Sequence, residues 1–237
     1  MKLYVDAGTT WSKVCELSDG SSDFSLQYKD YLKNVFGCKK QYIIPSNLLK
    51  TCKYKFLAAT GHMSKMNLKY DKNYLNEVLA LSKGFLVQQK NGLVLDLGSR
   101  DVKWVRFNNG KFKDLDWNNS CASATGATVE MLLKFYDVSV EDLEFVDERY
   151  NITCGIFGLE KIMDDIANGE QAKVAISKFL HGLAYNAWSF AKKPDEIFLS
   201  GGFCDNKCFI ESLSKYVKVN KLGRFVLVDG LISEFSS

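Results

Sequence analysis

The sequence lacks long apolar runs. It contains no stretch of roughly 18 consecutive apolar residues, the length that marks a candidate membrane-spanning helix, and its first residues, MKLYVDAG, hold no apolar signal core. Secretory signals need such a core near the N-terminus. We therefore expect a cytoplasmic protein with no membrane partner.

The chain also has little net charge, +3 at pH 7 from 31 Lys and Arg against 28 Asp and Glu. Domains that bind nucleic acid carry a strong basic excess or stripe, so we expect no DNA or RNA partner. The hydrophobic fraction of 46% and the charged fraction of 25% are those of an ordinary globular protein. A chain of 237 residues is long enough for one large domain or for two lobes that each bury a core.

Disulfide-type cysteine spacing is absent as well. The seven cysteines form an odd set without a CxxC pair, at positions 15, 38, 52, 121, 154, 204 and 208. Such a set is typical of a reducing compartment. Any metal site must therefore be assembled from residues that are distant in the sequence.

One pattern is present twice. Residues 3–17 run from an apolar strand through DAGTTWSK into a second apolar run, and residues 93–107 do the same through DLGSRDVK. Each copy ends in Asp-Gly or Asn-Gly, which predicts a β-hairpin. Without gaps, the copies align Asp6 with Asp96, Gly8 with Gly98, Thr9 with Ser99 and Lys13 with Lys103.

The duplication predicts two related α/β lobes, at 1–90 and 91–237, whose turns face a nucleotide cleft. In such a turn glycine lets the backbone approach a phosphate, N–H and hydroxyl groups hold its oxygens, and aspartate holds Mg²⁺ through water. A single Asp-x-Gly turn is also common hairpin chemistry. The second copy in register is what favours nucleotide binding.

The other elements follow from hydrophobic periodicity and from turn residues. We expect strands at 22–29, 54–59 and 196–200 and helices at 74–81, 139–148, 170–192 and 206–216. The strand at 196–200 runs into Gly201-Gly202, which suits the close approach of an adenine or ribose but also a plain strand-to-helix turn. We interpret His62 as a solvated loop residue, and His181, Cys204 and Cys208 as packed structural residues.

Two cysteines precede predicted helices. Cys121 lies in NSCASATGATVEMLLK (119–134), and Cys154 lies in NITCGIFGLEKIMDDI (151–166). A helix N-terminus favours the thiolate, which suits a cysteine that ligates a metal or reacts. The alternative is that both are small buried hydrophobic residues, as free cysteines often are.

Together these motifs resemble a known family. DAGTTWSK, DLGSRDVK and LSGGFCDN resemble, in this order, the phosphate 1, phosphate 2 and adenosine motifs of the actin/Hsp70/sugar-kinase ATPase superfamily, whose lobes are ribonuclease H-like. NNSCASATG followed by NITCGIF is similar to the BadF/BadG/BcrA/BcrD branch. That branch comprises activator ATPases of 2-hydroxyacyl-CoA dehydratases and the ATPase subunits of benzoyl-CoA reductase.

The resemblance implies a homodimer with one 4Fe–4S cluster at its two-fold axis, held by Cys121 and Cys154 of each subunit. Four thiolates suit a cubane cluster, and an isologous dimer of a chain with two suitable cysteines supplies four. The resemblance further implies that a ferredoxin or flavodoxin donates an electron, that ATP closes the lobes, and that an iron–sulfur dehydratase or reductase accepts the electron.

The resemblance also implies roles for the motif residues. Asp6 and Asp96 would hold Mg²⁺ or a water, and Gly126 would line the nucleotide. The phosphates would be held by Gly8, Thr9, Thr10, Lys13, Gly98 and Ser99, and the adenosine by Gly201 and Gly202.

Three features depart from the family pattern. Arg100 stands where a glutamine usually orients the attacking water, so hydrolysis is expected to be slow unless the arginine neutralises phosphate charge or pairs with Asp101. The final LVDGLISEFSS lacks the small-residue helix that usually follows the last strand, and lobe one is abbreviated.

Two other functions fit the same residues. The first is a small-molecule kinase in which Asp6 or Asp96 acts as the base for a substrate hydroxyl and the cysteines are incidental. The second is a non-hydrolysing nucleotide-binding dimer, which Arg100 and the C-terminal departure favour. Metal content separates the electron-transfer hypothesis from both.

Overall fold

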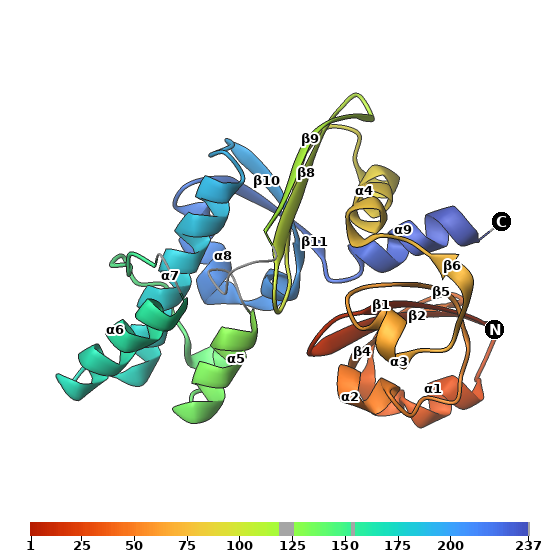
Figure 1. Ribbon diagram of the computed structural model, residues 1–237, viewed down its shortest axis with the longest axis horizontal. Helices are drawn as coiled ribbons and strands as arrows, with labels where there is room; N and C mark the ends of the chain where they lie inside the picture. The colour runs from red at the N-terminus through yellow and green to blue at the C-terminus, as the bar shows by residue number, and fades with distance from the viewer. Residues whose placement is uncertain (119–125, 153–154, 237) are drawn as a thin grey trace. The chain divides into compact units, whose positions relative to one another are not determined.

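The computed structural model describes residues 1–118, 126–152 and 155–236. These residues divide into two compact units. Unit 1 comprises Met1–Lys90 and the C-terminal segment that begins at Arg224, and unit 2 comprises Asn91–Gly223. Each unit contains one mixed sheet with helices packed on it, which confirms the expected α/β class (Figure 1). Among the described residues, no helix is long and apolar enough to cross a membrane.

Among the described residues, the strands of the unit 1 sheet lie in the order β3-β4-β2-β1-β5-β6. Strand β1 is central, antiparallel to β2 and parallel to β5. Alternate residues of β1, such as Leu3 and Val5, enter one core with Phe24 and Tyr42. The strands are β1 Lys2–Ala7, β2 Trp11–Leu17, β3 Leu32–Phe36, β4 Lys39–Pro45, β5 Phe56–Thr60 and β6 Tyr70–Tyr74.

Helices α4 and α9 of unit 1 are far apart in the sequence but lie side by side (Figure 1). A Cβ atom on Gly84 of α4 would lie 1.8 Å from the Val226 carbonyl oxygen, and one on Gly230 of α9 would lie 1.9 Å from that of Ala80. Glycine at both positions therefore lets the two backbones touch. The helices of unit 1 are α1 Asp23–Gln27, α2 Ser46–Leu49, α3 Ser64–Asn67, α4 Glu77–Gln88 and α9 Val226–Phe235, with a 3₁₀ turn, η1, at Lys29–Tyr31.

The sheet of unit 2 has the described order β11-β10-β7-β8-β9. Strand β7 is antiparallel to β8 and parallel to β10, so it has the same two kinds of neighbour as β1 in unit 1. The strands are β7 Gly92–Leu97, β8 Val102–Asn108, β9 Lys111–Asn118, β10 Glu196–Gly201 and β11 Lys218–Gly223.

Helix α7 fills the core of unit 2, where Ala175, Phe179 and Leu183 are fully buried. Phe179 packs where Gly158 of α6 leaves room, because a Cβ on that glycine would lie 2.5 Å from the Phe179 ring. The helices of unit 2 are α5 Gly126–Phe135, α6 Gly155–Ala167, α7 Ala172–Phe190 and α8 Lys207–Ser214, and the 3₁₀ turns are η3 Val140–Asp142 and η4 Gly202–Asp205.

Several predicted elements are confirmed. Both hairpins form, as β1–β2 and β7–β8, and the predicted strands at 54–59 and 196–200 are β5 and β10. The helices predicted at 170–192 and 206–216 are α7 and α8. The helix predicted at 74–81 is present as α4 but begins only at Glu77, because Tyr74 ends strand β6. His181 is packed, with 1% of its surface exposed and its Nε2 2.8 Å from the Tyr216 hydroxyl. Cys204 and Cys208 are buried, and His62 is exposed.

Two predicted elements are wrong. Residues 22–29 contain helix α1 and the start of η1 and not a strand, because Ser22 and Ser25 exchange hydrogen bonds as a capping box that starts a helix. Residues 139–148 contain only the single turn η3 and not a helix. Of the four apolar residues in this segment, only Leu143 is fully buried, so little apolar packing is available to stabilise a helix.

The C-terminal segment also differs from expectation. A helix, α9, does follow the last strand β11, and it contains the small residue Gly230. Residues from Arg224 onward pack in unit 1 and not in the second lobe, because α9 lies on α4 through the Gly84 and Gly230 contacts.

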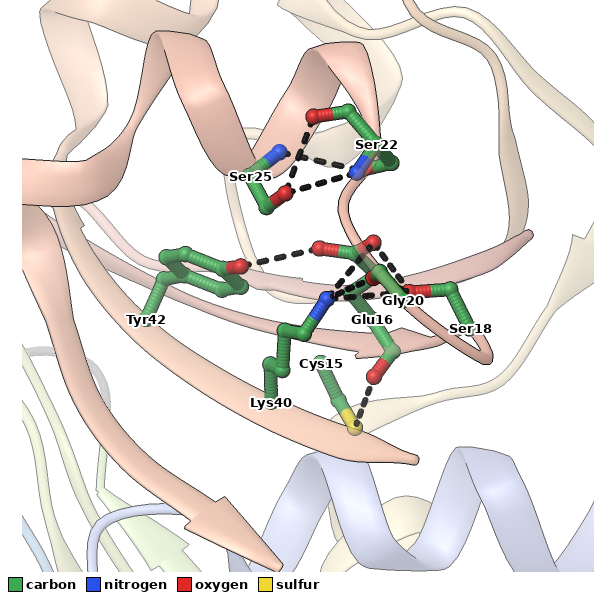
Figure 2. A network of polar contacts seen from close by, with 8 residues as sticks. All are labelled: Cys15, Glu16, Ser18, Gly20, Ser22, Ser25, Lys40 and Tyr42. Carbon is green, nitrogen blue, oxygen red and sulfur yellow. Dashed lines mark hydrogen bonds and ion pairs between the residues drawn. The ribbon is translucent and has the colours of Figure 1, made fainter. Parts of the chain in front are cut away.

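A buried carboxylate anchors the outer part of the unit 1 sheet. The Glu16 side chain on β2 is fully buried, accepts a hydrogen bond of 2.8 Å from the Tyr42 hydroxyl and another from Ser18, and lies 3.7 Å from the Lys40 ammonium (Figure 2). Burial alone would raise the pKa of Glu16, but the hydrogen bonds from Ser18, Ser22 and Tyr42 and the charge of Lys40 together lower it. The ionised carboxylate therefore stabilises the fold.

This arrangement predicts an acid-sensitive contribution to stability. A group whose pKa is depressed on folding stabilises the folded state above its unfolded pKa of about 4.5 and loses that contribution as the pH falls through the folded value. We expect Glu16→Gln to lower the free energy of unfolding at pH 7 by about 2 kcal/mol, because charged hydrogen bonds are lost. In urea denaturation the gap to the wild type should narrow below about pH 4.5. Asp30→Asn, at an exposed carboxylate, is the control, and a gap independent of pH would contradict the assignment.

Candidate functional site

In unit 1 the turn between β1 and β2 begins at a buried ion pair. Asp6 and Lys13 are cross-strand partners, and the Lys13 Nζ lies 3.1 Å from Asp6 Oδ2. Asp6 is only 5% exposed, so the pair is largely shielded from water. A lysine at this position fixes a positive charge beside the turn.

The backbone of this turn is held by its own glycine and by the start of α2. A Cβ on Gly8 would lie 2.5 Å from the Trp11 carbonyl oxygen, so only glycine fits. The Ser46 hydroxyl donates to the Gly8 carbonyl at 2.8 Å, and the Ser46 amide donates to the Thr10 carbonyl at 2.9 Å. The turn is therefore fixed from one side by hydrogen bonds to its carbonyl groups.

The corresponding turn in unit 2 has a larger ion-pair network. Lys103 is the cross-strand partner of Asp96, at 3.6 Å, and its Nζ also lies 3.0 Å from Asp101 Oδ2. The Trp117 indole donates to the same Asp101 oxygen at 2.6 Å. Lys103 is 2% exposed and Asp96 4%, so this network is more deeply buried than that of unit 1.

Helix α5 starts on this second turn. The Gly126 amide donates to the Gly98 carbonyl at 3.2 Å, and the Ala127 amide donates to the Ser99 carbonyl at 3.1 Å. A Cβ on Gly126 would meet Gly98 at 3.3 Å, Ser99 at 3.5 Å and the Phe203 ring at 3.6 Å. Gly126, Gly98 and Ser99, which the sequence places in one site, therefore do lie together.

The end of β10 reaches the same place. The Ser200 hydroxyl donates to Asp96 Oδ1 at 2.9 Å. Gly201 has φ +91°, and a Cβ there would lie 2.3 Å from the Leu97 carbonyl oxygen and 3.0 Å from Asp96 Oδ1. Glycine is therefore required at 201, whereas Gly202 is exposed with open space around it.

The structure extends the duplication beyond the hairpins. Thr60 at the end of β5 is the parallel partner of Asp6, as Ser200 at the end of β10 is of Asp96. Gly61 follows Thr60 and has φ +94°. A Cβ added to Gly61 would lie 2.5 Å from the Ala7 carbonyl oxygen, just as one added to Gly201 would lie close to the Leu97 carbonyl oxygen. Each unit therefore carries a row across three strands, consisting of a hydroxyl residue, an aspartate and a lysine.

Sequence reasoning missed part of this site. Lys103 aligns with Lys13 in the duplication. That alignment was a signal for the buried ion pair between Lys103 and Asp96. Thr60 and Ser200 carried a weaker signal, a hydroxyl residue before glycine at the end of an apolar strand. They lie at different distances in the sequence from their aspartates, so an ungapped alignment does not pair them.

The remaining predicted site residues have different outcomes. Thr9 and Arg100 are exposed at the tips of their turns. Cys121 and Cys154 lie outside the residues that the structure describes. Within the described ranges, no group of three or more His, Cys, Asp or Glu residues is placed to hold a metal ion. Burial raises the pKa of Cys15 and of Cys204 to about 12, so both are protonated, unreactive thiols at neutral pH.

Chemically, each unit presents the parts of an anion site. A tight glycine turn, a hydroxyl residue and a fixed lysine charge are what phosphate oxygens need, and in unit 2 the positive end of α5 adds to them. The buried aspartates provide carboxylates for a hydrated Mg²⁺. The residues of each unit therefore fit a phosphate group with its cation.

Comparison with known proteins identifies a family of ATPases. The family model of the BadF/BadG/BcrA/BcrD ATPase family matches residues 49–232. The activator of lactoyl-CoA dehydratase from Anaerotignum propionicum is 21% identical over 232 residues, covering 92% of this chain and 89% of its own.

Two solved structures share the fold. The activator of the 2-hydroxyisocaproyl-CoA dehydratase from Clostridium difficile with bound ADPNP superposes with a TM-score of 0.75 at 15% identity, covering 99% of this chain and 93% of its own. Component A of the (R)-2-hydroxyglutaryl-CoA dehydratase of Acidaminococcus fermentans gives a TM-score of 0.72 at 18% identity, covering 99% and 96%. The fold is that of the actin-like ATPases, and by its family match the chain belongs to the BadF/BadG/BcrA/BcrD ATPase family.

Proposed function

We propose that the protein is an ATP-dependent activator that passes an electron to an iron–sulfur dehydratase or reductase of the 2-hydroxyacyl-CoA dehydratase type. The observation that carries the proposal is the duplicated row of hydroxyl, aspartate and lysine beside a glycine turn in each unit. The family match and the names of its relatives support the coupling to a dehydratase.

The turns would bind the phosphates of ATP. In unit 1, Gly8, Thr9, Thr10 and Lys13 would hold phosphate oxygens, and Asp6 would hold Mg²⁺ through water. In unit 2, Gly98 and Ser99 would hold phosphate oxygens, and Asp96 would hold the cation or the attacking water. Gly201 and Gly202 would line the adenosine, and Gly126 would line the nucleotide. The hydrogen bonds that fix Gly8, Gly98 and Ser99 support this, because binding to a preformed turn costs little ordering.

The electron would be held between two copies of the chain. Cys121 and Cys154 from each subunit of a homodimer supply four thiolates, the donor set of a cubane cluster. A bound 4Fe–4S cluster would supply a one-electron store there, loaded by a ferredoxin or flavodoxin. ATP would change the conformation of such a dimer only if it binds one conformational state more tightly than the other.

Arg100 is the reason to expect slow ATP hydrolysis. It stands at the position where the family resemblance places a water-orienting glutamine, and arginine has no acceptor for a water proton. Slow turnover suits a switch that must stay in its ATP state until the partner has docked.

Iron content tests the cluster. Protein purified without oxygen should contain about two iron and two sulfide per chain, because one four-iron cluster is shared by two chains. Cys121→Ala and Cys154→Ala should each lose the iron and the visible absorption, whereas Cys38→Ala, at an exposed cysteine, should keep both. Anaerobic wild-type protein that holds no iron even after reconstitution would contradict the electron-transfer proposal and favour a kinase or a nucleotide-binding dimer.

Phosphate release tests the ATPase. Asp96→Asn should lower kcat/KM by on the order of 10²-fold, because a buried charge beside the reacting phosphate is lost, while Asp116→Asn, on the exposed side of β9, should match the wild type. Arg100→Gln should raise kcat by restoring an acceptor for the attacking water. If neither the wild type nor Arg100→Gln exceeds the rate without protein, the hydrolysis claim fails.

A further inference from the structure

The two rows also differ in their hydroxyl groups. In unit 2 the Ser200 hydroxyl donates to Asp96 Oδ1 at 2.9 Å. In unit 1 the equivalent residue, Thr60, is 0% exposed, and its buried hydroxyl has no hydrogen-bond partner among the residues that the structure describes. Thr60 and Asp6 are paired across β5 and β1, so their side chains lie on the same face of the sheet.

The backbone next to Thr60 is fixed. Gly61 packs against Ala7, whose carbonyl accepts a 2.9 Å hydrogen bond from the Met63 amide. The Ser64 hydroxyl donates to the Gly61 carbonyl at 2.7 Å. These contacts hold the backbone that follows Thr60 in place.

A buried hydroxyl without a partner lowers stability, and valine has nearly the same shape without that cost. Most buried polar groups are paired, and an unpaired one at a site that binds a ligand often completes its hydrogen bonds there. The same row already contains a carboxylate and an ammonium, Asp6 and Lys13, 3.1 Å apart. The Thr60 side chain thus lies on the same face of the sheet as these two charged residues.

We propose that Thr60 is a positioning residue of the nucleotide reaction, whose hydroxyl and the Asp6 carboxylate together hold a water molecule that contacts the bound phosphate or its cation. The inference rests on the proposed function, because it requires ATP at the turn of unit 1. Ser200 has no such role, since its hydroxyl is already used by Asp96.

The inference predicts opposite effects on stability and turnover. Thr60→Val should be at least as stable as the wild type in urea denaturation without nucleotide, because it removes an unpaired hydroxyl. Its kcat for ATP should fall about tenfold, the effect of one lost hydrogen bond in the transition state, with KM changed less than twofold. Thr60→Ser should restore kcat, and Thr51→Val, at an exposed threonine of the same unit, should leave both quantities unchanged.

Ser200→Ala provides the structural contrast, because it removes a hydroxyl that does have a partner and should lower stability. If Thr60→Val loses stability as Ser200→Ala does and keeps the kcat of the wild type, the Thr60 hydroxyl is structural and the inference is overturned. Unchanged stability with unchanged kcat would also overturn it. If the wild type neither binds nor hydrolyses MgATP, the proposed function fails first, and the inference falls with it.

Discussion

The structure depends on a buried aspartate–lysine pair that recurs at the base of each hairpin turn. Lys13 lies 3.1 Å from Asp6, and Lys103 lies 3.6 Å from Asp96. The Lys13 side chain is 13% exposed, and the other three residues are buried. Burying two charges costs several kcal/mol, and such pairs often contribute little net stability. The same pair in both units supports the proposal that each provides a fixed charge beside a phosphate-binding turn.

Glycine determines how closely the surrounding backbone approaches these pairs. Gly61 and Gly201 both have positive φ and contact the carbonyl of the residue after the aspartate, and Gly8 and Gly98 allow the tight turns themselves. A side chain at any of these positions would push the next strand or turn away from the aspartate. The geometry of the site thus follows from a few positions that tolerate no Cβ.

Much of this was predictable from the sequence, for a physical reason. Hairpins with Asp-Gly or Asn-Gly ends and apolar alternation are local signals, and the ungapped alignment of Asp6 with Asp96 and Lys13 with Lys103 fixed their register. The stripe of α7 was equally clear. The family resemblance, read from the same motifs, agrees with the family match.

What failed depended on contacts or on competing local signals. Residues 22–29 alternate like a strand, but the capping box of Ser22 and Ser25 makes a helix. The return of α9 to unit 1 rests on the contact of Gly84 with Gly230, which no local pattern reveals. The unpaired hydroxyl of Thr60 is likewise visible only once β5 is placed beside β1.

The central claim is that the duplicated turns are phosphate-binding turns. Its most direct test is a crystal structure of the protein with Mg²⁺ and a non-hydrolysable ATP analogue. The account predicts β- or γ-phosphate oxygens within about 3.2 Å of donors in the turns at 8–10 and 98–99, the reach of a hydrogen bond. A structure in which both phosphates lie more than ~4 Å from the Thr9 and Ser99 turns would contradict it.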